Sequence, residues 1–182
     1  ANVAKLLHSN GDAPSFLKNL QLDDNGHSEL KAARAKVRRC LRAEFAKASK
    51  AEFGVTVQPR FFTQGSYAYK TINEPAWTPP QQKDLDDGAY LPMTFVQGAK
   101  PSVAAAAFFT VVDRALQELA KTEGWKFVRK PTCARLIISN DAHIDVPLYA
   151  IPDAQFMLLE KALQARTFDG ALDARADSID RW

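Results

Sequence analysis

Apolar side chains recur at helical spacing in three segments of the chain. Residues 28–52 contain no Gly or Pro and repeat apolar residues every three or four positions, and residues 101–122 and 152–166 show a similar pattern. Gly124 follows the second segment at the position of a helix C-cap. The pattern therefore predicts two long helices and a further amphipathic helix near the end of the chain.

Short runs rich in β-branched or aromatic residues lie between these segments and predict strands. They cover residues 60–63, 125–128, 134–138 and 143–146, with one more strand around Asp84. A short helix is expected from Tyr67 to Ile72, and the prolines at 75, 79 and 80 predict an irregular loop. Helices and strands are therefore both expected, with three strands in succession after the second long helix, and we expect that helix to pack against a sheet.

Size and composition indicate one soluble globular domain. The chain has 182 residues, 46% of them hydrophobic, and a formal net charge of +3, which suits a polyphosphate site without requiring a nucleic-acid partner. Cys40 and Cys133 have neither CxxC spacing nor a histidine pattern, so neither a disulfide framework nor a zinc site is predicted. We therefore expect a protein of the reducing cytoplasm.

Targeting and membrane signals are not found in the sequence. Residues 1–8 are too polar for the apolar part of a secretory signal. The longest apolar run, residues 103–112, is about half of the roughly 20 residues that a membrane helix needs. We expect a soluble protein that is not exported and has no membrane partner.

Three aspartates carry the candidate chemistry. On a strand, residues two apart share a face, so Asp84 and Asp86 present paired carboxylates while Leu85 points into the core. Asp145 lies in a second strand, between two apolar residues. Carboxylates from two strands are what two divalent cations need in nucleotidyl transfer, and an all-oxygen ligand set favours Mg²⁺, with Mn²⁺ as a substitute. Asp84, Asp86 and Asp145 are therefore the predicted catalytic and metal-binding residues.

A small turn upstream of the aspartates is the predicted phosphate site. Gln64, Gly65 and Ser66 follow a predicted strand and precede a predicted short helix, where free backbone N–H groups favour an anion. Arg135 is a candidate contact for a triphosphate, ahead of Lys70 and Lys130. For Tyr69, stacking on a nucleobase and packing in the core are equally good interpretations.

Structural alternatives remain for each motif. The Asp84 segment also fits a surface turn, whereas an EF-hand fails because its glycine stands one position early. Asp145 also fits an ion pair on an edge strand. His143 could lie behind the metal ligands, but a hydrogen bond within the fold is the better interpretation. The basic face of the first long helix suits a phosphate backbone, but a solvated scaffold face is the better interpretation.

Several stretches resemble the bacterial cGAS/DncV-like nucleotidyltransferases, and the DncV branch in particular. They are Pro59–Thr71, Lys83–Met93, Gly124–Phe127, Thr132–Arg135 and His143–Pro152, and the likeness runs from about residue 28 to residue 156. The resemblance implies an α+β fold with a polymerase-β-like core, a mixed sheet flanked by helices. Family members continue into a helical lobe that closes the nucleotide cleft, and this lobe is expected to be largely missing from this chain.

We expect the chain to divide into three parts. Residues 1–27 would be a polar N-terminal segment with a short helix, and residues 28–166 the nucleotidyltransferase core with its long basic helix. Residues 167–182 would be the start or a remnant of the helical lobe.

The implied activity is synthesis of a cyclic dinucleotide, 3′,3′-cyclic GMP-AMP, from ATP and GTP with two Mg²⁺ ions. Such enzymes serve antiphage defence by activating a separate effector. By position, Gln64, Gly65 and Ser66 would hold the donor phosphates, Tyr69 would stack on a base, and Arg135 would contact the triphosphate. The protein would be a monomer, and the zinc ligands of the animal DNA sensors are missing, so no DNA activator is expected.

Two other functions remain open from the sequence. One is a template-independent nucleotidyltransferase that modifies RNA, protein or a small molecule. The other is a nucleotide-binding or RNA-binding module in which the basic helix binds and the acidic cluster is idle.

Overall fold

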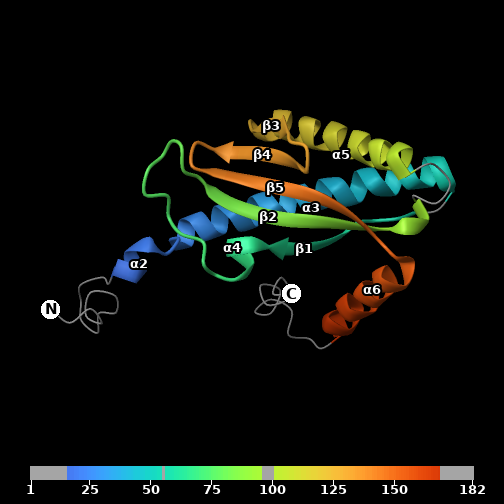
Figure 1. Ribbon diagram of the computed structural model, residues 1–182, viewed down its shortest axis with the longest axis horizontal. Helices are drawn as coiled ribbons and strands as arrows, with labels where there is room; N and C mark the ends of the chain where they lie inside the picture. Colours follow the sequence, from blue (N-terminus) through green and yellow to red (C-terminus); the bar gives the residue numbers. More distant parts are fainter. Residues whose placement is uncertain (1–15, 55, 96–100, 169–182) are drawn as a thin grey trace.

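A five-stranded mixed sheet forms the centre of the molecule (Figure 1). The computed structural model describes residues 16–54, 56–95 and 101–168. The strand order is β1-β2-β5-β4-β3, and within these described ranges only the β2–β5 pair is parallel. The strands are β1 (Arg60–Gln64), β2 (Lys83–Pro92), β3 (Lys126–Arg129), β4 (Cys133–Ser139) and β5 (Ala142–Ile151).

Two long helices cover one face of this sheet, and shorter helices lie at its edges (Figure 1). The long helices are α3 (Asp24–Phe53) and α5 (Pro101–Glu123). The others are α2 (Phe16–Leu20), α4 (Gly65–Ala68), the 3₁₀ turn η1 (Met93–Phe95) and α6 (Asp153–Phe168). The predicted mixed sheet flanked by helices is thus confirmed. No helix in the described part of the chain combines the length and apolarity that crossing a bilayer requires.

The helix α3 shows how local sequence fixes an element. Its predicted start was residue 28, but it begins four residues earlier because the Asp23 side chain accepts a hydrogen bond of 2.6 Å from the Gly26 N–H. It ends at Gly54, whose φ of +71° belongs to the left-handed region that glycine adopts readily. The exposed backbone groups at both ends are therefore capped.

The core lies between the two long helices and the sheet. Its most buried members come from α3, α5 and the inward-facing positions of β2, β4 and β5: Leu30, Val37, Leu41, Val112, Leu116, Leu85, Leu136, Ile144 and Val146. Because side chains alternate along a strand, this leaves the neighbouring positions of β2 and β5 on the opposite face.

Two predicted elements were wrong in their bounds. The predicted strand covers residues 143–146 and stops before Pro147. In the structure, β5 continues to Ile151 because β2 pairs with it along that length. Pro147 is tolerated opposite Cys133, where β4 begins. The short helix expected at 67–72 is instead α4, which starts at Gly65 and is followed by Lys70 in a left-handed conformation, φ +58°.

A buried ion pair ties α3 to β2. Asp87 is fully buried on the helix-covered face, and its two oxygens accept hydrogen bonds of 2.8 and 2.6 Å from Arg38. Thr63 joins both partners, since its hydroxyl accepts from Arg38 and from Arg34 and donates to Asp87. A buried carboxylate is stable only with such partners. This network fixes the position of the helix relative to the strand.

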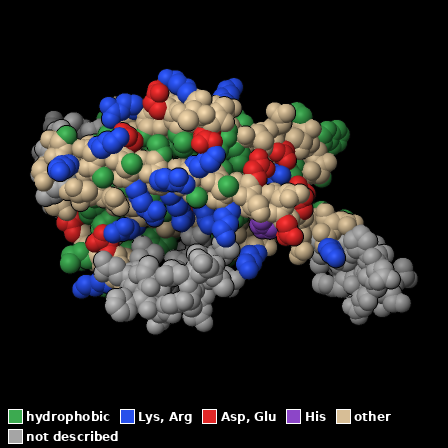
Figure 2. Space-filling model, turned by 180° about the vertical axis from the view of Figure 1, so that it is seen from behind, with side chains coloured by type: hydrophobic (Ala, Val, Ile, Leu, Met, Phe, Trp, Pro, Cys, Tyr) green, Lys and Arg blue, Asp and Glu red, His purple; other side chains and the backbone are tan. Residues whose placement is uncertain are grey.

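The basic face of α3 is consequently divided between two environments. Seen from behind, Lys and Arg side chains gather across the middle of the molecule (Figure 2). Lys31 and Arg39 are exposed and help to line a surface hollow, whereas Arg34 is only 7% exposed and bonds to Thr63. The interpretation as a solvated scaffold face is therefore wrong for Arg34 and Arg38.

We expect Asp87→Asn to lower the free energy of unfolding by about 3 kcal/mol, because it removes the anionic partner of a desolvated guanidinium. Urea titration measures this directly. Glu118→Gln is the matched control, since it breaks an ion pair with Lys121 that is 67–72% exposed, and it should change stability by less than about 0.5 kcal/mol. Equal effects of the two substitutions would contradict the proposed anchoring role.

Candidate active site

The parallel pairing of β2 with β5 brings the acidic residues together. In this register Asp84 lies opposite His143, and Asp86 lies opposite Asp145. Asp84 and Asp86 are two residues apart and so point to the same face, the one not covered by α3 and α5. The edge-strand interpretation of Asp145 is wrong, because β5 is a central strand between β2 and β4.

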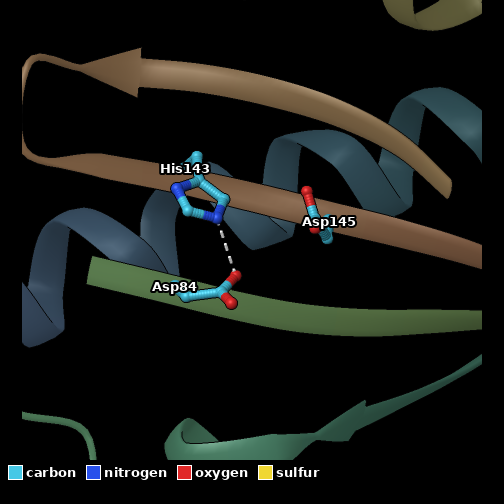
Figure 3. Close-up of side chains that lie close together, drawn as sticks. All are labelled: Asp84, His143 and Asp145. Atoms are coloured by element: carbon cyan, nitrogen blue, oxygen red, sulfur yellow. Dashed lines mark ion pairs between the residues drawn. The ribbon is translucent and has the colours of Figure 1, made fainter. Parts of the chain in front are cut away.

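Three of these side chains form a close cluster (Figure 3). One ligand atom each from Asp84, His143 and Asp145 can be chosen so that all lie within 4.8 Å of one another. His143 Nε2 is 2.9 Å from Asp84 Oδ1, yet both atoms are buried and neither makes a well-aligned hydrogen bond with a described residue. The cluster therefore contains buried polar atoms whose bonding capacity is not satisfied.

Asp86 completes the acidic group and touches the turn that follows β1. Burial raises its pKa, and the negative charges of Asp84 and Asp145 raise it further. Its carboxylate rests against Gly65: a Cβ built on that glycine would come within 2.5 Å of Asp86 Oδ2. The φ of +65° therefore favours glycine at position 65, and an added Cβ would also displace the Asp86 carboxylate.

A bidentate ion pair holds Asp145. Arg135 Nε and Nη2 donate hydrogen bonds of 2.6 Å to its two oxygens, and Lys130 Nζ lies 3.9 Å away. Burial acts to raise the pKa of Asp145, but the hydrogen bonds and charge of Arg135 outweigh it, so the pKa is lowered. Asp145 is therefore ionised at neutral pH, and Arg135, expected at a triphosphate, contacts a carboxylate in this structure.

The predicted phosphate-site residues occupy the turn beside Asp86. Gly65 and Ser66 open α4, where the first N–H groups of a helix have no partner inside the helix. Tyr69 directly follows α4 and is 78% exposed, so the interpretation that it packs in the core is wrong. Gln64 does not point freely into solvent, because its Nε2 donates a hydrogen bond of 2.6 Å to the Tyr90 hydroxyl.

An aromatic pair that the sequence analysis missed lies on the same face of the sheet. The rings of Tyr90 and Tyr149 stack with centroids 4.8 Å apart, and the Tyr149 hydroxyl donates to Gln64 Oε1 at 3.4 Å. Strand alternation was the available signal, because Tyr90 stands four and six residues after Asp86 and Asp84 and therefore shares their face. The pair extends the acidic site along the strands.

The donor set of this site fits a hard divalent cation. The site offers carboxylate oxygens from neighbouring strands, and the pKa of Asp86 is raised by burial and by the charges of Asp84 and Asp145. A cation placed among these carboxylates would relieve their repulsion. Asp84 Oδ1 and His143 Nε2, whose bonding capacity is not satisfied by described residues, are further donors that a bound cation would use. The residues present are thus compatible with bound metal.

Comparison with known proteins places this geometry in a family. The family model "Cyclic GMP-AMP synthase DncV-like, nucleotidyltransferase domain" matches residues 59–149, half of the chain, which include the three aspartates and the Gly65 turn. The chain belongs to the DncV-like nucleotidyltransferase family. The recognition made from the sequence motifs is thereby confirmed, and with it the α+β nucleotidyltransferase core.

Two curated relatives illustrate the relationship. A cyclic GMP-AMP synthase of Escherichia coli (strain TW11681) is 44% identical over 110 residues, which cover 59% of this chain and 25% of the relative. The cyclic GMP-AMP synthase of Vibrio cholerae serotype O1 (strain ATCC 39315 / El Tor Inaba N16961) is 44% identical over 109 residues, covering 59% of this chain and 24% of the relative. The matched region is thus about a quarter of the length of each DncV-like relative.

Solved structures of Vibrio cholerae DncV share the fold. DncV in complex with the linear intermediate 5′ pppA(3′,5′)pG matches with a TM-score of 0.66 and 32% identity over 84% of this chain and 50% of that chain. A mutant DncV in a complex that includes ATP and GTP gives a TM-score of 0.72 and 30% identity over 90% and 54%. The chain spans about half the length of these DncV structures.

Asp86→Asn should stabilise the metal-free protein at neutral pH. An aspartate whose folded-state pKa is raised costs stability once ionised, and this cost is absent at pH values below its unfolded pKa, where the carboxyl is protonated in both states. The gain should be under about 1 kcal/mol, because solvent screens a half-exposed group. Unfolding at several pH values in chelator measures it. The gain should disappear at acidic pH, and a variant less stable than wild type at neutral pH would refute the electrostatic interpretation.

Replacing Gly65 by Ala tests the contact between the turn and Asp86. Gly54→Ala is the matched control, since Gly54 has nearly the same φ but nothing within 4 Å of an added Cβ. Both variants should lose about 1 kcal/mol from backbone strain. Only Gly65→Ala should also weaken Mn²⁺ binding, measured by calorimetry, because it displaces the Asp86 carboxylate. Equal Mn²⁺ affinity in the two variants would contradict this assignment.

Proposed function

We propose that this chain is the catalytic core of a cyclic dinucleotide synthase that makes 3′,3′-cyclic GMP-AMP from ATP and GTP. The observation that carries the proposal is the convergence of Asp84, Asp86 and Asp145 beside the Gly65 turn, in a chain of the DncV-like family. Relatives named cyclic GMP-AMP synthase, and a DncV structure holding a linear dinucleotide, support the substrates and the product class.

Each candidate residue has a proposed task. Asp84, Asp86 and Asp145 hold two Mg²⁺ ions, for which Mn²⁺ can substitute, and their strands provide a rigid platform. When bound, the cations supply charge that orients the attacking hydroxyl and stabilises the leaving pyrophosphate. The backbone N–H groups of Gly65 and Ser66, with the Ser66 hydroxyl and Gln64, hold the donor phosphates at the start of α4.

The remaining side chains position the nucleotides. Exposed Tyr69 offers an aromatic face for a nucleobase. Arg135 uses two of its five N–H donors on Asp145, so the guanidinium can bridge this carboxylate and a triphosphate. A ribose hydroxyl of the acceptor then loses its proton to water and forms a bond to the donor α-phosphorus, while the bond from that phosphorus to pyrophosphate breaks. A second such step, with a second pyrophosphate leaving, closes the ring.

The family resemblance also suggests a biological setting, which belongs to this proposal. We place the enzyme in antiphage defence, as a cytoplasmic monomer whose product activates a separate effector. No DNA activator is proposed, because the zinc ligands of the animal DNA sensors have no counterpart in this sequence. A transferase that adds a nucleotide to RNA, protein or a small molecule is the alternative enzyme, and it would use the same acids.

The decisive measurement is mass spectrometry of products made from ATP and GTP with Mg²⁺ by the full-length protein that contains this chain. We expect cyclic GMP-AMP, and a roughly thousandfold lower rate for Asp86→Asn, because a metal ligand is lost. Glu118→Gln, on the exposed side of α5, should retain the wild-type rate. Nucleotide binding without any transfer product would favour a binding module, and a linear or protein-linked product would favour the alternative transferase.

A further inference from the structure

The hydrogen bonds around His143 assign its tautomer. His143 is 6% exposed, and its Nδ1 lies 3.0 Å from Gln82 Oε1. The orientation of the Gln82 amide is fixed by its other end, because Gln82 Nε2 donates to the backbone oxygen of Asn140 at 3.0 Å. Gln82 therefore presents an acceptor to Nδ1, which must carry the hydrogen. In the neutral ring, this leaves the lone pair on Nε2.

That lone pair points into the acidic cluster. Nε2 has no aligned hydrogen-bond partner among the described residues, and it lies 2.9 Å from Asp84 Oδ1, which is also without one. Two acceptors at this distance repel each other unless a positive centre lies near both. For metal–ligand bonds of about 2.1 Å at right angles, neighbouring ligand atoms are about 3.0 Å apart. The observed spacing thus matches two adjacent ligands of one ion.

We propose that His143 Nε2 is a ligand of the divalent cation held by Asp84 and Asp145, and that Gln82 orients the ring for this role. The inference rests on the proposed function, since it concerns the same cation site, but it adds a nitrogen to an all-oxygen set. Mg²⁺ prefers oxygen, whereas first-row transition-metal ions accept imidazole readily. His143 therefore favours Mn²⁺ and its neighbours over Mg²⁺ at this position.

Electron spin echo spectroscopy of bound Mn²⁺ detects a coordinated nitrogen directly. The probe is Mn²⁺ with inorganic triphosphate, which contains no nitrogen, added to full-length protein with and without ¹⁵N-labelled histidine. We expect a strong ¹⁴N coupling that changes to ¹⁵N coupling on labelling. His143→Gln should remove the coupling and weaken Mn²⁺ binding about tenfold, with a smaller effect on Mg²⁺. His27→Gln on α3, beside Tyr67, should change neither.

The possible outcomes separate the two proposals. Mn²⁺ binding that requires Asp84 and shows no histidine coupling overturns the role of His143 and leaves the proposed cation site intact. Failure of the wild-type protein to bind Mn²⁺ at all overturns both. The labelling experiment needs no substitution, so the inference stays testable even if His143→Gln does not fold.

Discussion

The parallel register between β2 and β5 is the constraint on which the site depends. Among the described strands it is the only parallel pairing, and it sets Asp84 beside His143 and Asp86 beside Asp145. A shift of one residue would turn every side chain of a strand to the opposite face. The buried residues Leu85, Ile144 and Val146 make such a shift costly, since they would have to leave the core. Hydrophobic burial on one face therefore holds the acids in place on the other.

The acidic side chains of the segment Asp84–Asp87 point to both faces of the sheet. Asp84 and Asp86 face the candidate site, whereas Asp87 faces α3 and is neutralised by Arg38. At the start of the strand, the buried Lys83 pairs with Asp141 at 2.9 Å, in the turn between β4 and β5. Ion pairs thus fix β2 to the connection between β4 and β5 at the start of the strand and to α3 farther along it. The position of Asp84 is thus determined by ion pairs of residues that have no part in the proposed reaction.

The sequence predicted the order of elements well, and it predicted tertiary contacts less well. Alternation along β2 was enough to place Asp84 and Asp86 on one face, and motif order was enough to recognise the family. The full length of β5 was missed because Pro147 looks like a strand terminator when the partner strand is unknown. The burial of Asp87 was missed for the same kind of reason: its partners Arg38 and Thr63 are distant in sequence, and charge runs on helices are commonly solvated. Local pattern reveals which face a residue occupies, but not what covers that face.

The Arg135–Asp145 pair has an electrostatic consequence for the protein without bound cations. Three carboxylates on adjacent strands would repel one another strongly if no cation were present. The guanidinium acts as a built-in counter-ion for one of them, with hydrogen bonds of 2.6 Å to both oxygens. Folding of this core therefore does not have to wait for a dissolved cation to neutralise Asp145. The three carboxylates can therefore be brought together during folding and bind cations afterwards, at a site that is already formed.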